Sequence, residues 1–366
     1  MKRQAVWGSI AVTIALGIGS GLGCGGGGGA AGKPVETPDP SLGPATPAKP
    51  PATGTTPAAG GSDGPAAASS SEDVTKGTAS VKAGDWSAAR AYFEAAIKKN
   101  PKQADAHYYL GLVMDKTGDR AAAEKSYRTA LELQPDLQEA SENLTAILIE
   151  TQKFDDAVVL AKKALARNAK NAEMQLNLAI ALSGKGDVDA ATKAFDAAVK
   201  LAPNDPRFYL AYAQHLGAAK KNDEAIGKLK EALRVAGDDP VMLGTIGGEF
   251  RTARDVPDCI AAFDKAITLK DNADFRTNRA MCKLAAKDKP GAVTDLQAAT
   301  TKDPAFAPAH YWLGSIFHDD GKFAEAIAEY DAYLKAAPKG PMAKKAEEKS
   351  KLAKDKKKPE KPAPKR

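Results

Sequence analysis

Few side chains in this sequence are suited to catalysis or metal binding. The histidines and cysteines that could act in catalysis or bind a metal are His107, His215, His310, His318, Cys24, Cys259 and Cys282. None of these cysteines forms a Cys-x-x-Cys pair, and none stands at zinc-ligand spacing from a histidine. The glycine run at residues 25–29 lacks the Lys-Ser/Thr pair of a phosphate-binding loop. We therefore expect no enzyme active site, no metal and no cofactor.

The first cysteine has a different context. Met1, Lys2 and Arg3 provide a positive start, and residues 4–23 are uncharged. That arrangement is typical of an export signal, which we assign to residues 1–23. The segment Gly21-Leu22-Gly23-Cys24 resembles the bacterial lipobox, although Gly21 stands where that motif usually has Leu. The resemblance implies that Cys24 becomes the lipid-modified N-terminus. Because Gly25 is not Asp, it also implies an outer-membrane lipoprotein facing the periplasm.

Residues 24–72 hold nine prolines and eleven glycines among mostly Ala, Ser and Thr. Such a segment cannot bury enough apolar surface to offset its ordering entropy, so we expect a disordered tether.

The formal net charge of the whole chain is +6. Residues 339–366 hold twelve Lys and Arg against four Asp and Glu, so residues 1–338 are close to neutral. We expect residues 356–366 to form a disordered basic tail, with an anionic envelope polymer as a possible ligand. We expect no nucleic-acid-binding domain in the rest of the chain.

From about residue 70 the sequence repeats every 34 residues. Small, large and proline residues recur at fixed places of the unit. In the second unit these residues are Leu110, Gly111, Met114, Gly118, Asp119, Ala123, Tyr127, Ala130 and Pro135. In the last unit the equivalent residues are Leu313, Gly314, Phe317, Gly321, Phe323, Ala326, Tyr330 and Pro338. This pattern resembles the tetratricopeptide repeat family.

The spacing within each unit predicts two helices that pack together. Apolar residues at unit positions 4, 7, 8 and 11 form one helical stripe, and those at 20, 24, 27 and 28 form a second. Small residues at positions 8 and 20 allow close approach, and Gly-Asp at 15 and 16 turns the chain. We expect an all-α, right-handed superhelical solenoid of about eight helix-turn-helix units over residues 73–340. Residues 341–355 are expected to form a capping helix.

The resemblance places partner binding on the faces of the first helices, where Asn at position 6 holds a peptide backbone in some family members. The predicted partner-binding residues are Asn143, Asn177, Asn278, Tyr108, Leu112, Leu176, Ile180, Tyr311 and Trp312. Inheritance of the family's consensus residue is an alternative reason for the asparagines. In the third unit, Glu139, Glu142 and Glu150 make this face acidic.

The sixth and seventh units depart from the pattern. Three glycines crowd the first helix of the sixth unit, at residues 244, 247 and 248. Arg279 and Lys283 occupy usually apolar positions, so we expect their long stems to reach solvent.

Cys259 and Cys282 fall at small, buried places near a unit junction. We expect buried free thiols, while export leaves a disulfide open as the alternative.

The function expected from these features is a non-catalytic scaffold in the bacterial cell envelope. It would be held to the membrane by its lipid anchor and would recruit or assemble proteins or extended peptide segments. The alternative is a regulator of an envelope enzyme or of a peptidoglycan-associated complex. Hydrophobic residues make up 43% of the chain and aromatic residues 6%, which fits alanine-rich helical repeats better than one large core.

Overall fold

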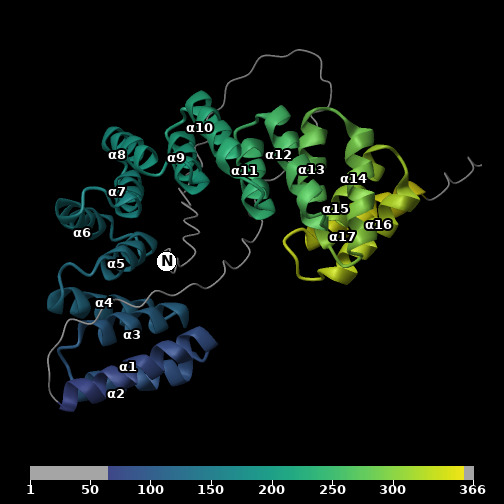
Figure 1. The fold of residues 1–366 in the computed structure, drawn as a ribbon. Helices are drawn as coiled ribbons and strands as arrows, with labels where there is room; N and C mark the ends of the chain where they lie inside the picture. Colours follow the sequence, from purple (N-terminus) through teal and green to yellow (C-terminus); the bar gives the residue numbers. More distant parts are fainter. Residues whose placement is uncertain (1–64, 358–366) are drawn as a thin grey trace, which may run out of the picture. The chain divides into compact units, whose positions relative to one another are not determined.

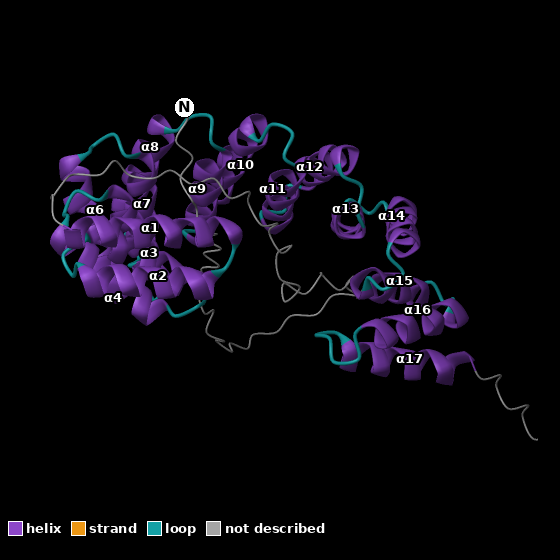
Figure 2. Ribbon diagram, turned by 60° about the horizontal axis from the view of Figure 1, so that its bottom comes forward, coloured by secondary structure: helices purple, strands orange, loops and turns teal. Residues whose placement is uncertain are grey.

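The computed structural model describes residues 65–357. Within this range the chain forms 17 α-helices and no β-strand (Figure 2). The helices are α1 (Pro65–Ala83), α2 (Trp86–Lys99), α3 (Ala104–Lys116), α4 (Arg120–Leu133), α5 (Gln138–Glu150), α6 (Phe154–Arg167), α7 (Ala172–Gly184), α8 (Val188–Leu201), α9 (Pro206–Ala218), α10 (Asn222–Val235), α11 (Pro240–Thr252), α12 (Val256–Leu269), α13 (Ala273–Ala285), α14 (Lys289–Lys302), α15 (Ala307–Asp319), α16 (Phe323–Ala336) and α17 (Ala343–Lys357).

The helices fall into two compact units, unit 1 with α1–α9 and unit 2 with α10–α17, divided between Lys220 and Lys221. Within unit 1, α1–α8 pack as four consecutive pairs and α9 packs on α8; within unit 2, α10 packs on α11, α11–α16 form three pairs, and α17 packs on α16. We call the first helix of each repeat the A helix and the second the B helix, so that α9 is an A helix and α10 a B helix. The predicted all-α solenoid of helix-turn-helix repeats is confirmed, with A helices beginning at intervals of 33 or 34 residues from α3 onward.

In four of the repeats a glycine of the A helix faces an aromatic ring of the B helix, and the two helices pack closely there. A Cβ atom added to Gly111 would lie 2.7 Å from the Tyr127 ring, and one added to Gly314 would lie 2.9 Å from the Tyr330 ring. Real Cβ contacts are longer, so only glycine permits this approach. Tyr127 and Tyr330 are fully buried as a result.

The turn between the A and B helices requires a left-handed residue in every repeat. Glycine fills this place at Gly84, Gly118, Gly186 and Gly321, with φ between 74° and 88°. The four remaining repeats use Gln152, Lys220, Arg254 and Lys287, with φ between 59° and 63°. The next residue is often Asp, as in Asp119, whose carboxylate accepts a hydrogen bond from the Ala122 amide at 3.0 Å. This cap starts the B helix.

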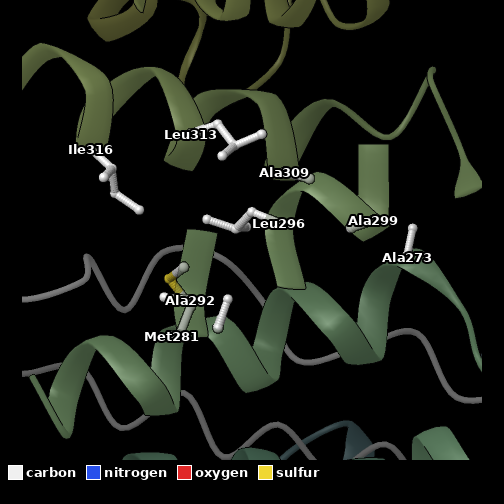
Figure 3. Packing of buried hydrophobic residues seen from close by; sticks show 9 residues of the cluster. Ala273, Met281, Ala292, Leu296, Ala299, Ala309, Leu313 and Ile316 are labelled. Carbon is white, nitrogen blue, oxygen red and sulfur yellow. The ribbon is translucent and has the colours of Figure 1, made fainter. Parts of the chain in front are cut away.

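The core is continuous between adjacent pairs in each unit. In unit 2, Met281 of α13 and Leu296 of α14 pack with Leu313 and Ile316 of α15, and alanines fill the spaces between them (Figure 3). The A helix of one repeat therefore covers the apolar face of the repeat before it. No single repeat buries its apolar residues alone.

Four expectations about the fold require correction. Helix α1 begins at Pro65, so residues 65–72, expected in the tether, are helical. Proline suits the first turn of a helix, and the alanines that follow are strong helix formers. Helix α17 runs to Lys357, so residues 356 and 357, expected in the tail, are helical too. Residues 1–64 and 358–366 lie outside the described range.

The third correction concerns Arg279 and Lys283, which were expected to extend toward solvent. Both instead bind the carboxylate of Asp295, whose side chain is 2% exposed, with Arg279 Nε and Lys283 Nζ each 2.8 Å from Oδ2. A buried carboxylate needs cationic partners, so the two unusual residues form an ion-pair cluster between α13 and α14.

Cys259 of α12 and Cys282 of α13 form a disulfide, with 6.1 Å between their Cα atoms. Burial of both residues was expected, and they are 0% and 1% exposed. The expectation of free thiols was wrong, because the junction of adjacent repeats brings the two Cα atoms within bridging distance.

Candidate functional site

The A helices of unit 1 form the candidate site. Helix α7 contacts both α5 and α9, so equivalent positions of these A helices lie on one continuous surface. In Figure 1, α5 and α7 lie on the inner side of the curve that unit 1 follows, and α6 and α8 lie on its outer side. We call the surface formed by the A helices α3, α5, α7 and α9 the A-helix surface.

The predicted asparagines differ in exposure. Asn143 is half-buried, and its Nδ2 donates to the Tyr127 hydroxyl at 3.3 Å. Asn177 is only 1% exposed, and its Oδ1 has no hydrogen-bond donor among the described residues. In unit 2, Asn278 Nδ2 donates to the backbone oxygen and the carboxylate of Asp274 at 3.0 and 3.1 Å. Thus Asn143 is partly accessible, whereas Asn177 is covered by its neighbours.

The predicted apolar contact residues are buried between repeats. Tyr108 and Leu112 of α3 are 8% and 5% exposed, and Leu176 and Ile180 of α7 are 7% and 8% exposed. The Tyr108 ring lies 5.9 Å from that of Tyr127. These four side chains therefore offer a partner little area in this conformation, and partner contact through them stays a prediction.

Carboxylates recur on the A helices α3, α5 and α7, whereas the second residue of α9 is Arg207. Asp105, Glu139 and Glu173 occupy the second position of α3, α5 and α7, and Glu142 lies one turn after Glu139. Burial raises the pKa of Asp105 and of Glu142. Glu139 and Glu142 were expected on this face from the sequence, whereas Asp105 and Glu173 were not, although Asp105, Glu139 and Glu173 share one unit position.

Glu173 has the largest perturbation in this group. Burial raises its pKa to about 7, against the opposing effect of Arg207. Arg207 Nη2 donates to Glu173 Oε1 at 2.8 Å and also contacts Asp205. Among the described residues, Glu173 Oε2 has no hydrogen-bond donor. The acidic residue Glu150, by contrast, pairs with Arg120 at 2.9 Å, so its charge is compensated.

The two predicted aromatic residues of the last repeat line a small apolar pocket in unit 2. Tyr311 is 4% exposed, and Trp312 is half-buried. The pocket measures about 100 Å³ and is lined by Ala307, Pro308, Tyr311, Trp312, Tyr333, Ala337, Pro341 and Met342. It lies where α15, the end of α16 and the segment before α17 meet.

Two of the histidines, His215 and His310, connect neighbouring helices. His215 is 2% exposed, and its ring nitrogens lie 2.8 Å from Ser183 Oγ and 3.1 Å from Thr192 Oγ1. It thereby joins α9 to α7 and α8. His310 Nδ1 lies 2.6 Å from Glu329 Oε2, and this contact raises the pKa of the imidazole.

Over residues 65–357, no group of three or more His, Cys, Asp or Glu side chains is arranged to hold a metal ion. The same residues contain no helix with the length and apolar character needed to cross a bilayer. Cys24, the predicted lipidation site, lies outside the described residues.

Comparison with known proteins agrees with this geometry. Two family models, each described as "Tetratricopeptide repeat", match residues 78–236 and 277–341. The chain belongs to the tetratricopeptide repeat family. Members of this family are generally scaffolds for protein interactions, and their repeats bind proteins or peptides.

Individual relatives are distant. Cellulose synthase operon protein C of Xanthomonas axonopodis is 28% identical over 232 residues, which cover 58% of this chain and 15% of that protein. The Hsp70-Hsp90 organizing protein of Triticum aestivum is 25% identical over 237 residues, covering 61% of this chain and 39% of that protein. The chain therefore spans well under half the length of these curated relatives.

Among solved structures, yeast Tom70 matches with a TM-score of 0.53 and 18% identity, covering 78% of this chain and 64% of Tom70. A tetratricopeptide repeat protein from Parabacteroides merdae matches with a TM-score of 0.49 and 20% identity, covering 64% of this chain and 94% of that protein. The similarity to Tom70 shows the fold alone.

Proposed function

We propose that this protein is a non-catalytic scaffold, anchored by lipid in the bacterial cell envelope, that recruits or assembles other proteins on its A-helix surface. The observation that carries the proposal is the alignment of the A helices, which places the half-buried carboxylates of Asp105, Glu142 and Glu173 and the half-buried amide of Asn143 along one surface of unit 1. An extended segment that crosses several repeats would meet hydrogen-bonding groups at regular intervals.

Two features support the location. The sequence of residues 1–24 has the positive start, the uncharged run and the cysteine that suit export and lipid attachment. The disulfide between Cys259 and Cys282 fits an oxidising compartment, where such bonds form and persist.

Crosslinking in intact envelopes, followed by capture of this protein, tests the recruiting role. We expect crosslinks from partner proteins to map to α3, α5, α7 and α9. Substituting Asn143 with Ala should weaken binding of a captured partner, because each buried hydrogen bond contributes about 1 kcal/mol. Crosslinks confined to the B helices would contradict the proposed surface.

The anchor has a separate test. Cys24→Ala should leave a larger, unprocessed precursor that takes up no labelled acyl chain, because the thiol is the attachment point. Cys259→Ala serves as a matched control, since it removes a cysteine outside the export segment. Normal processing and acylation of the Cys24 variant would refute lipid anchoring at this residue.

A further inference from the structure

The apolar pocket of unit 2 has walls that are fixed by contacts within the protein. The Tyr311 ring packs against Trp312 and Tyr333, with ring centroids 5.4 and 5.8 Å apart. The Tyr333 hydroxyl accepts a hydrogen bond from the Met342 amide at 2.9 Å, which joins α16 to the segment before α17. A Cβ atom added to Gly340 would lie only 2.6 Å from that hydroxyl, so this segment packs directly on the ring. The pocket is therefore preformed, as ligand sites usually are.

The size and the lining of this pocket suit one small apolar ring. Its volume of about 100 Å³ is smaller than that of an apolar cavity of roughly 150 Å³ that holds benzene. Trp312 is half-buried, so part of its side chain remains accessible to an occupant. Because the lining is apolar, an N–H group brought into the pocket would find no acceptor there. Proline has a compact ring and no N–H, which makes it the residue best suited to this pocket.

The segments that line the pocket carry positive charge. Residues 304–317 and 332–346 contain every lining residue, and they include four lysines and no Asp or Glu. Lys339 lies in the loop that forms one wall, and Lys344 lies in the first turn of α17. Both residues are exposed, and neither forms an ion pair among the described residues. An occupant with carboxylates beside its apolar ring would therefore be attracted to this site.

We propose that this pocket binds a proline of an extended, acidic segment in a partner protein. The proline ring would pack among Tyr311, Trp312 and Tyr333. Neighbouring Glu or Asp side chains of the partner would pair with Lys339 and Lys344. A proline-rich segment is extended before it binds, so it loses little conformational entropy at the site. The pocket lies in unit 2, so this site is additional to the proposed A-helix surface of unit 1 and does not depend on it.

The test measures binding of a labelled peptide of about nine residues, in which proline and glutamate alternate, to the full chain. Three comparison peptides replace proline with alanine, glutamate with glutamine, or glutamate with lysine. We expect the alanine peptide to bind at least about tenfold more weakly, because it lacks the ring. The glutamine peptide should bind about threefold more weakly and without the salt dependence of the parent peptide, and the lysine peptide should not bind. Equal affinity of the parent peptide and any comparison peptide would overturn the inference.

Two matched variants locate the site. Ala337→Leu places a larger side chain in the lining of the pocket and should weaken binding of the parent peptide at least about tenfold. Ala336→Leu makes the same change at the neighbouring exposed residue, which does not line the pocket, and should alter affinity by less than about twofold. Equal effects of the two variants would place the peptide elsewhere and overturn the inference.

The lysines provide a test that leaves the packing intact. Lys339→Gln combined with Lys344→Gln should weaken binding of the parent peptide about threefold without changing the melting temperature, since both residues are exposed. The control combines Lys162→Gln with Lys163→Gln, two exposed residues of α6 in unit 1, and should alter affinity by less than about twofold. This comparison decides the matter if Ala337→Leu does not fold. Equal effects of the two double variants would contradict the assigned site.

A deletion identifies the source of the bound segment. Residues 34–40 of this chain, Pro-Val-Glu-Thr-Pro-Asp-Pro, have the same chemistry as the expected occupant. If their deletion raises the affinity of the parent peptide at least about tenfold, the chain's own residues compete for the pocket at high effective concentration, and the assignment to a partner is overturned. Unchanged affinity supports a partner. Asn143→Ala should not alter binding of this peptide, so failure of this inference and failure of the proposed A-helix surface are separate results.

Discussion

Glu173 is a residue whose charge opposes folding at neutral pH. Burial raises its pKa to about 7, well above the value of about 4.3 expected in an unfolded chain. Between these two values the folded protein binds more protons than the unfolded one. The contribution of Glu173 to the free energy of unfolding therefore decreases as pH rises from about 4.5 to 7.

Glu173→Gln should remove this pH dependence. At pH 5 the wild-type side chain is protonated and resembles Gln, so the two proteins should melt at similar temperatures. At pH 8 the variant should be more stable by about 1–3 kcal/mol, since Arg207 keeps its contact with Asp205. Thermal melts across this pH range measure the difference. If the difference in stability between the wild type and Glu173→Gln did not change with pH, or if Glu132→Gln on α4 gave the same difference, burial of the charged Glu173 side chain would not be destabilising.

The sequence pattern predicted the position of a residue within its repeat better than it predicted the burial and the contacts of that residue. Asn177 was expected on an exposed surface, but its environment depends on how the neighbouring repeats pack, and it is 1% exposed. Similarly, the partner of Arg279 and Lys283 is Asp295, on the following helix. Such a pairing depends on the angle between two helices, which a periodic pattern does not specify.

At the scale of elements, α11 has three glycines with different roles. Added Cβ atoms at Gly244 and Gly247 would lie 2.5 Å from the Phe275 ring and 2.8 Å from the Phe263 ring. At Gly248 an added Cβ would have no neighbour within 4 Å. Two of the glycines therefore allow packing against aromatic rings, which offsets the helix weakness suggested by sequence. The third has no such compensation.

Two alanine substitutions in α11 should therefore have opposite effects. Gly247→Ala should destabilise the protein by about 1–3 kcal/mol, because the Phe263 ring must move. Gly248→Ala should stabilise it by about 0.5–1 kcal/mol, because alanine restricts the unfolded chain and favours the helix. Denaturant unfolding of the two variants measures both changes. Effects of the same sign would contradict this account of the packing.

The helices themselves were highly predictable. The A helices from α3 to α15 begin at residues 104, 138, 172, 206, 240, 273 and 307, in agreement with the expected period of 34 residues. This precision arises because turn, cap and packing positions are local and recur in each repeat. The first helix was less predictable, because Pro65 starts it within a segment of tether-like composition.

At the scale of the whole molecule, α17 closes the end of the solenoid in unit 2. The Tyr333 hydroxyl accepts a hydrogen bond from the Met342 amide at 2.9 Å, and Ala346 is fully buried in the same cluster as Tyr311 and Tyr330. Without α17 this apolar face of the last repeat would meet water. Terminal repeats of solenoids need such a polar cover.

Deletion of residues 343–366 should therefore lower stability by at least about 2 kcal/mol and increase binding of a hydrophobic dye. Deletion of residues 358–366 alone removes the basic end and leaves α17 intact, so it should change neither quantity. Calorimetry and dye fluorescence on the two truncated proteins make the comparison. Equal behaviour would show that α17 does not cap the array.

The disulfide also affects how the molecule would respond to force. Repeat solenoids contact only their neighbours, so a chain pulled from its two ends can lose its repeats one at a time. Cys259 and Cys282 are separated by 23 residues in sequence and by 6.1 Å between Cα atoms. Their bond withholds about 80 Å of chain from extension, since each residue spans at most about 3.3–3.6 Å. A repeat array stretched between an anchor and a load would thus reach a shorter maximum length while this disulfide is intact. Reduction of the disulfide would release the enclosed chain segment in one step.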